Sequence, residues 1–154
     1  MNDPYNLQRF VAAQADIFER VKAELQEGRK TSHWMWFIFP QLKGLGFSAI
    51  AQRYAICSRG EAEAYLGHQI LGPRLRDCTD LVCCVEGRSI REIFGTPDDL
   101  KFRSSMTLFA NVALDKQLFT SALDKYFHGE PDRKTLELLR QIGAGIVDGE
   151  APRR

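Results

Sequence analysis

Residues 6–26 of the chain read NLQRFVAAQADIFERVKAELQ, and this stretch decides the fold class. Its apolar side chains recur at intervals of three and four residues, which is the spacing of one face of an α-helix. They are Leu7, Phe10, Val11, Ile17, Phe18, Val21 and Leu25. Gly28 follows, and glycine is common directly after the end of a helix. The spacing therefore predicts one amphipathic helix from Asn6 to Gln26.

Most of the remaining chain follows the same period. A stripe between Leu71 and Val85 predicts a helix from Pro73 to Gly87 that turns Cys78 inward. Ser58 and Ser89 each precede a glutamate by three residues, the form of a capping box at a helix start. Three later helices are expected over residues 97–112, 115–127 and from 131 onward. We therefore predict an all-α fold with a single compact multihelical domain of about seven or eight helices over residues 1–143, and a flexible tail over 144–154.

Composition limits the classes of function. The 21 basic and 20 acidic side chains give a net charge of +1, which argues against a long nucleic-acid partner. The four cysteines, Cys57, Cys78, Cys83 and Cys84, fit neither a disulfide framework nor a zinc site, so no metal and no cofactor is expected. No signal peptide is visible, and no run approaches the ~18 apolar residues of a membrane helix. We therefore expect a cytoplasmic protein without a membrane partner.

The segment 28–46 interrupts the helical pattern. Both tryptophans, Trp34 and Trp36, lie within six consecutive apolar residues, and Pro40 follows them. A cap at Thr31 or Ser32 and a stop at Pro40 favour a short buried helix over a strand. One interpretation makes this segment the hydrophobic centre of the domain.

The alternative interpretation is a small-molecule pocket. Lys30 and His33 precede the aromatic residues and Gln41 follows them, and apolar walls with a few fixed polar groups are typical of ligand sites. The helix that follows Thr96 adds Lys101, Ser104 and Thr107 on neighbouring positions. These side chains are of the types that hold phosphate or ribose oxygens, although a solvated helix face has the same pattern.

The chain resembles the bacterial family catalogued as domain of unknown function 1810 (DUF1810). The resemblance rests on GRKTSHWMWFIFPQ at 28–41, EAEAYL at 61–66, Ile93-Phe94-Gly95 with Pro97-Asp98-Asp99 and Lys101, and RSSMTLF at 103–109. It covers about residues 4–140 and implies a compact multihelical fold without supplying a reaction. Gln69 and Phe102 depart from the expected Pro and Leu.

A second, distant likeness concerns the NADAR superfamily of N-glycosidases. It rests on Asp99-x-Lys101, Met106-x-x-Phe109 and Gly129-x-x-Asp132. This likeness implies cleavage of an N-glycosidic bond in a nucleotide or ADP-ribose derivative. Such cleavage needs a carboxylate near the anomeric carbon, a donor for the leaving base and a surface on which the base stacks.

Three hypotheses result. In the first, the chain is an N-glycosidase-like hydrolase with Asp132 and His33 catalytic, and Asp98 or Asp99 as alternative carboxylates. Its small anionic ligand is then held by Lys30, Trp34, Trp36, Gln41, Lys101, Ser104 and Thr107. In the second, the chain is a noncatalytic binding or interaction module, with a homo-oligomer as one form. In the third, it is a hydrolase that pairs His33 with Ser32, Ser104 or Cys57.

Charge asymmetry favours an anionic ligand. Arg29, Lys30 and His33 lie in one aromatic segment, and no acid occurs between Glu27 and Glu61. We therefore expect a local basic site beside the tryptophans.

Overall fold

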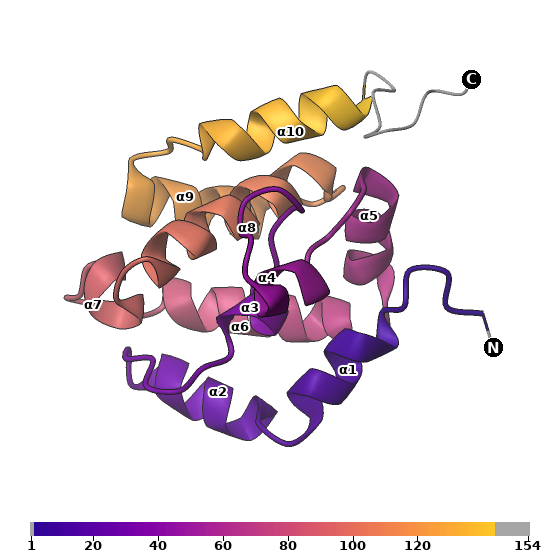
Figure 1. Cartoon of the computed structure of the whole chain (residues 1–154). Helices are drawn as coiled ribbons and strands as arrows, with labels where there is room; N and C mark the ends of the chain where they lie inside the picture. Colours follow the sequence, from indigo (N-terminus) through magenta and orange to yellow (C-terminus); the bar gives the residue numbers. More distant parts are fainter. Residues whose placement is uncertain (1, 144–154) are drawn as a thin grey trace.

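The computed structural model describes residues 2–143, which form ten helices (Figure 1). They are α1 (Gln8–Ala15), α2 (Phe18–Gln26), α3 (Met35–Ile38), α4 (Ala49–Arg53), α5 (Arg59–Gly67), α6 (Leu71–Cys83), α7 (Ile90–Phe94), α8 (Asp98–Val112), α9 (Gln117–Phe127) and α10 (Arg133–Gly143). The predicted all-α fold is confirmed: residues 2–143 form a single compact helical domain without a strand. The ten helices of residues 2–143 are more than the seven or eight expected, and the predicted tail lies outside the described residues.

Helix α8 is the centre of the domain. Its residues 102 and 104–110 are all buried, because α5, α7, α9 and α10 pack around it. Helix α6 packs against α2, α5 and α9, and so lies between the N-terminal helices and the α8–α9 pair (Figure 1). Contacts with four neighbouring helices thus bury this part of α8 in the core of the domain, polar side chains included. Helix α8 therefore provides a rigid support for the side chains that it carries at its exposed N-terminal end.

The helix predicted over residues 6–26 is two helices in the structure. Helix α1 ends at Ala15 and α2 begins at Phe18, directly after Ile17, whose φ of −120° departs from helical geometry. The apolar stripe continues across this break, but its two halves have different partners, since α1 packs on α3 and α2 packs on α6. The spacing of apolar residues does not record this change of direction.

Several predicted helix starts are confirmed in part. Ser89 and Glu92 form the complete capping box. Ser58 accepts from the Glu61 amide, but the Glu61 carboxylate accepts from the Cys57 amide and pairs with Arg9 at 2.9 Å instead. Helix α6 begins at Leu71, two residues before the predicted Pro73. Cys78 is buried as predicted, and burial raises the pKa of its thiol to about 12.

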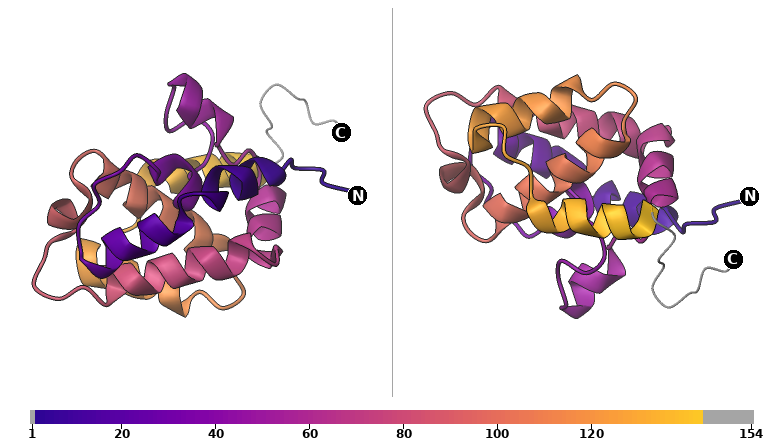
Figure 2. Two further views of the ribbon diagram at one scale, coloured as in Figure 1. Left: turned by 90° about the horizontal axis from the view of Figure 1, so that it is seen from below. Right: turned by 90° about the horizontal axis from the view of Figure 1, so that it is seen from above.

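A short arm, residues 43–53, projects from the body of the molecule and contains α4 (Figure 2). Its base is closed by a bridge, in which the Ile56 amide donates to Gln41 O and the Lys43 amide to Ile56 O, both at 2.9 Å. No residue of α4 is buried, and Phe47 is 77% exposed. Few buried contacts therefore hold the arm, which is the condition for local opening.

Within residues 2–143, no helix combines the length and the apolar character needed to cross a membrane. That same part of the chain brings together no cluster of three or more His, Cys, Asp or Glu side chains that could bind a metal ion.

Candidate functional site

The two tryptophans of the aromatic segment have opposite environments. Trp34 is fully buried, and its indole nitrogen donates a hydrogen bond of 2.9 Å to Glu24 Oε1. The backbone amides of Thr31 and Ser32 and the Ser32 hydroxyl donate to the same carboxylate, which therefore holds the whole turn before α3. The buried indole of Trp34 leaves no face for a ligand, so of the two rings expected to stack on a base only that of Trp36 is partly exposed.

Glu24 is ionised by this arrangement. Burial on its own would raise the pKa of its carboxyl, but the hydrogen bonds from Ser32, Thr31 and Trp34 outweigh burial and lower the pKa to about 2. The carboxylate accepts these hydrogen bonds from the protein itself. It is therefore a structural anchor for the aromatic segment.

Trp36 is half-buried and faces a small recess. The Lys101 ammonium lies over its ring, with Nζ 5.2 Å from the ring centroid. The recess is lined by Met35, Trp36, Phe39, Gln41, Ala51, Tyr54 and Lys101, and its volume of about 10 Å³ is enough for one water molecule. Its lining residues come from three parts of the chain. These are α3 with the few residues directly after it, the arm together with Tyr54 at its C-terminal end, and α8. We call it the Trp36 recess.

A charged triplet joins the two tryptophans. Asp98, in the first turn of α8, pairs through Oδ2 with Lys30 Nζ at 2.9 Å and through Oδ1 with Lys101 Nζ at 3.3 Å. The Lys30 side chain is only 8% exposed and lies against the Trp34 ring, whereas that of Lys101 is 23% exposed. The expected basic site is thus neutralised in part by an acid from another helix. Lys101 is the member of the triplet that lines the recess.

Ser104, Thr107 and Asp132 are held elsewhere. The Ser104 hydroxyl donates to Leu100 O and that of Thr107 to Arg103 O, so both are engaged within α8. Thr107 Oγ1 also accepts from the Asp132 amide at 2.9 Å, and the Asp132 carboxylate caps α10 by accepting from the amide and the hydroxyl of Thr135. Thr107 and Asp132 form the joint between α8 and α10, and none of the three residues lines the Trp36 recess.

His33 does not form the expected nucleophilic pair with either serine, and its pairing with Cys57 stays a prediction. Its side chain is exposed, and the neighbouring Ser32 donates its hydroxyl to Glu24. Ser104 is buried in α8. The structure thus gives the His33 hydrolase hypothesis no assembled nucleophile from either serine.

Sequence reasoning missed the anchor and one wall of the recess. Glu24 lies ten positions before Trp34 on another helix, and no local spacing marks the pair. Ala51 and Tyr54 reach the recess because the arm folds back, which no pattern in the sequence indicates. Asp98 was a candidate carboxylate, but its pairing with Lys101 was missed, although the two lie three residues apart in a predicted helix and such pairs share a helix face.

A larger polar crevice near the N-terminus is built around one arginine. The Arg9 guanidinium donates to the carbonyls of Tyr5, Asn6, Arg53 and Ala55 and to the Glu61 carboxylate. The crevice has a volume of about 580 Å³ and is open to solvent. Because the arginine is engaged by the protein itself, we assign it the structural role of fastening α1 to the segment before α5.

Residues 2–143 thus form a small all-α domain with an aromatic recess that is lined by one lysine, Lys101. The chain belongs to the family described as protein of unknown function (DUF1810), whose model matches residues 4–139. It is similar over 90% of its length to the crystal structure of the conserved hypothetical protein Rv1873 from Mycobacterium tuberculosis, with 58% identity, a TM-score of 0.89 and 99% of that chain covered. A search among curated proteins found no match. The likeness to the NADAR N-glycosidases stays a prediction.

Proposed function

We propose that this protein binds a small anionic ligand with a planar ring, of the nucleotide type, at the Trp36 recess. One observation carries the proposal: Lys101 lies over the partly exposed ring of Trp36 and is itself partly exposed. An aromatic face that is partly open to solvent provides a stacking surface, and an ammonium beside it provides a charge for phosphate. Gln41 adds an amide that can both donate and accept at the same recess.

The charge balance of the triplet supports an anion. Lys30, Lys101 and Asp98 together carry a formal charge of +1. Asp98 fixes both ammonium groups, because each oxygen of its carboxylate holds one lysine. A lysine that is already positioned loses less side-chain entropy when a ligand binds. The triplet therefore offers a phosphate one preorganised positive charge next to a stacking surface.

The small volume of the recess means that the arm takes part in binding. About 10 Å³ cannot hold a purine or a phosphate. Ala51 and Tyr54 form the wall of the recess on the side of the arm, and α4 has no buried residue. In this proposal the arm moves away to admit the ligand and then closes over the ring that stacks on Trp36.

Hydrolysis of an N-glycosidic bond is the second candidate function. The observation that favours it is a carboxylate, Asp98, in direct contact with the lysine of the recess. In such a reaction water adds to the anomeric carbon while the bond to the base nitrogen breaks, and the base leaves with a proton. A fixed carboxylate stabilises the positive charge that develops on the sugar. Asp98 takes this role in our proposal in place of Asp132, whose carboxylate caps α10.

Binding is tested by calorimetric titration with AMP, ADP-ribose, adenosine and inorganic phosphate. We expect AMP or ADP-ribose to bind at least about tenfold more tightly than adenosine or phosphate, because only the nucleotides use both the ring and the ammonium. Lys22→Ala is the matched control for Lys101→Ala, since Lys22 also lies over an aromatic ring and pairs with an acid three residues away. Equal affinity of both variants, or no binding of any nucleotide, would contradict the proposal.

Cleavage is tested separately by incubating each ligand that binds and separating the products by chromatography. Release of free base by the wild type, with loss of release in Asp98→Asn, supports hydrolysis. Intact ligand after long incubation with the wild type would exclude hydrolysis of that ligand and leave binding as the function.

A further inference from the structure

The Trp36 recess contains two hydrogen-bonding side chains that the protein itself leaves unused. Gln41 and Tyr54 both line it. Within residues 2–143, neither the amide of Gln41 nor the hydroxyl of Tyr54 forms a hydrogen bond. Gln41 is half-buried, and Tyr54 is only 9% exposed. Buried polar groups usually have a partner, so an exception at a recess calls for an explanation.

Other tyrosines of the fold have a partner for their hydroxyl. The hydroxyl of Tyr65, which is fully buried, accepts from the Gln14 amide at 3.2 Å. The hydroxyl of Tyr126, which is half-buried, donates to Val82 O at 2.6 Å. A buried tyrosine hydroxyl is expected to find such a bond. Tyr54 therefore differs from both in having a hydroxyl that the protein does not satisfy, and it is the one of the three that lines the recess.

The arm and the aromatic segment hold the two side chains in place. A Cβ atom added to Gly46 would lie 3.6 Å from Gln41 Nε2 and 2.9 Å from Ala51 Cβ, so the arm packs closely beside the Gln41 amide. The ring of Tyr54 packs against that of Phe37, with 5.3 Å between the ring centroids. Both polar groups are therefore positioned by neighbouring residues that form no hydrogen bond with them.

The chemistry of the two groups matches the edge of a nucleobase. A primary amide presents a donor and an acceptor side by side, and a hydroxyl can act as either. Nucleobases carry a donor next to an acceptor on their edges, whereas a plain aromatic ring does not. We infer that Gln41 and Tyr54 bind the edge of a nucleobase that carries an exocyclic amino or oxo group, while Trp36 stacks on its face. This inference rests on the proposed function, because it concerns the ligand of the same recess.

The pair makes the recess selective for the ring as well as for the phosphate. When a ring covers the recess, the Gln41 amide and the Tyr54 hydroxyl lose their access to water. A ring without a matching edge then leaves both groups unpaired, which costs binding free energy. Sites that hydrogen-bond a ligand reject analogues that lack the bonding group more strongly than apolar pockets reject a similar shape.

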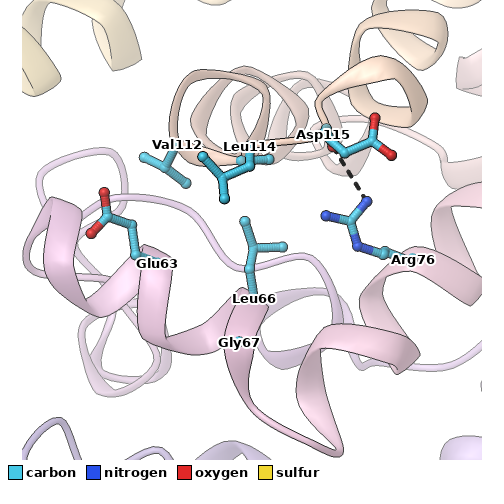
Figure 3. A pocket seen from close by; sticks show the side chains of 8 residues that line it. Glu63, Leu66, Gly67, Arg76, Val112, Leu114 and Asp115 are labelled. Atoms are coloured by element: carbon cyan, nitrogen blue, oxygen red, sulfur yellow. Dashed lines mark hydrogen bonds between the residues drawn. The ribbon is translucent and has the colours of Figure 1, made fainter.

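A larger hollow elsewhere on the molecule lacks this combination and serves for comparison. It has a volume of about 480 Å³ and lies where α5, α6 and the α8–α9 connection meet (Figure 3). Figure 3 shows the apolar side chains of Leu66, Val112 and Leu114 in its centre. At one end, the Arg76 guanidinium donates to Asp115 O at 3.5 Å. The centre of this hollow therefore offers a nucleobase no polar group for its edge.

The test is calorimetric titration of the full chain with AMP, GMP and purine riboside 5′-monophosphate, a nucleotide whose ring has no exocyclic group. The wild type should bind the better of AMP and GMP at least about tenfold more tightly than purine riboside 5′-monophosphate. Gln41→Leu should weaken binding of that better nucleotide about tenfold and change the affinity for purine riboside 5′-monophosphate less than about twofold. The control Gln117→Leu changes an exposed glutamine of α9 and should leave all three affinities as they are.

Tyr54→Phe and Tyr126→Phe form a matched pair, because each removes one hydroxyl. Tyr54→Phe should weaken binding of the better nucleotide several-fold and leave the urea midpoint unchanged, since this hydroxyl has no partner in residues 2–143. Tyr126→Phe should lower the urea midpoint and leave the affinity unchanged, since it loses the bond to Val82 O. Arg76→Ala, at the hollow of Figure 3, should also leave the affinity unchanged.

The outcomes separate this inference from the proposal on which it rests. Equal affinity of the wild type for all three nucleotides, or an equal loss for all three in Gln41→Leu, would overturn the edge recognition and leave binding at the recess intact. Tyr54→Phe with a lower urea midpoint and full affinity would make its hydroxyl structural and overturn its part in recognition. Lost affinity in Arg76→Ala with full affinity in Gln41→Leu would move the ligand to the other hollow. No binding of any nucleotide would overturn both.

Discussion

Trp34 and Trp36 are two residues apart but have different environments. Trp34 is fully buried, and its indole nitrogen donates to a carboxylate that also holds the preceding turn. Trp36 is half-buried, faces a recess and carries an ammonium above its ring. The difference shows that one aromatic run can contain both a core residue and a partly exposed ring, and in our proposal the exposed ring is the one that binds the ligand.

The carboxylates near the two rings explain why their environments differ. Glu24 on α2 is engaged by four donors and contributes to folding, whereas Asp98 on α8 divides its two oxygens between Lys30 and Lys101. Saturated polar groups fix a structure, and partly open ones leave capacity for a ligand. Substitutions on the Trp34 side should therefore change stability, and those on the Trp36 side should change binding.

The largest expected effect is that of Trp34→Ala. Removing a fully buried aromatic side chain leaves a cavity and costs about 3–5 kcal/mol of unfolding free energy. The matched variant Trp36→Ala should cost less, about 1–2 kcal/mol, because its ring is only partly buried. Urea denaturation of both proteins measures the difference. Equal losses in the two variants would remove the distinction between the rings.

Glu24→Gln should be the next most destabilising change, by about 2 kcal/mol at neutral pH, since it removes the charge from four hydrogen bonds. The pKa of Glu24 is lowered from 4.5 to about 2 in the folded protein. Its contribution is therefore fully present above pH 4.5 and is lost as the pH falls towards 2.

Denaturation at several pH values checks this linkage. The wild type should lose stability on acidification between pH 4.5 and 2 more steeply than Glu24→Gln. Allowing for the partial exposure of the carboxylate, the extra loss is on the order of 2 kcal/mol. Parallel pH profiles for the two proteins would show that Glu24 is not the anchor.

Lys101→Ala tests the Trp36 side of the comparison. The variant should bind AMP or ADP-ribose at least about tenfold more weakly, or about 1.4 kcal/mol, while its unfolding free energy stays within about 1 kcal/mol of the wild type. Calorimetric titration and urea denaturation give the two values. A large loss of stability with unchanged affinity would assign Lys101 to the fold.

Trp36→Phe should give the smallest effect. Phenylalanine keeps a stacking surface but a smaller one and loses the indole donor, so affinity should fall only a few-fold, which corresponds to less than about 1 kcal/mol. Stability should hardly change. A complete loss of binding in the calorimeter would mean that the indole N–H itself holds the ligand.

The fold was largely predictable because helical spacing is local. Ser89 with Glu92, the α8 and α9 segments and the inward position of Cys78 all depend on residues within a few turns of one another. The break between α1 and α2 was missed, since it depends on which helices the two halves meet. The prediction of one long helix failed for this reason.

Several residues of the candidate site could be predicted individually, but their arrangement could not. Trp36, Gln41 and Lys101 were identified as candidates, and the structure places them around one recess. Asp132 and Thr107 were grouped with them because of their residue types, but the capping of α10 holds both at another joint. The contacts between Glu24 and Trp34 and between Asp98 and Lys30 cross between elements, so no spacing within one segment could show them.

The most direct test uses the fact that the chain has only two tryptophans. Each contributes one indole N–H resonance to a two-dimensional ¹H–¹⁵N spectrum, and Trp36→Phe assigns them. On titration with AMP or ADP-ribose, we expect the Trp36 resonance to shift saturably and the Trp34 resonance to stay essentially unchanged. A nucleotide that binds while the Trp36 resonance stays in place, or a spectrum that no nucleotide alters, would contradict the proposal that the Trp36 recess is the binding site.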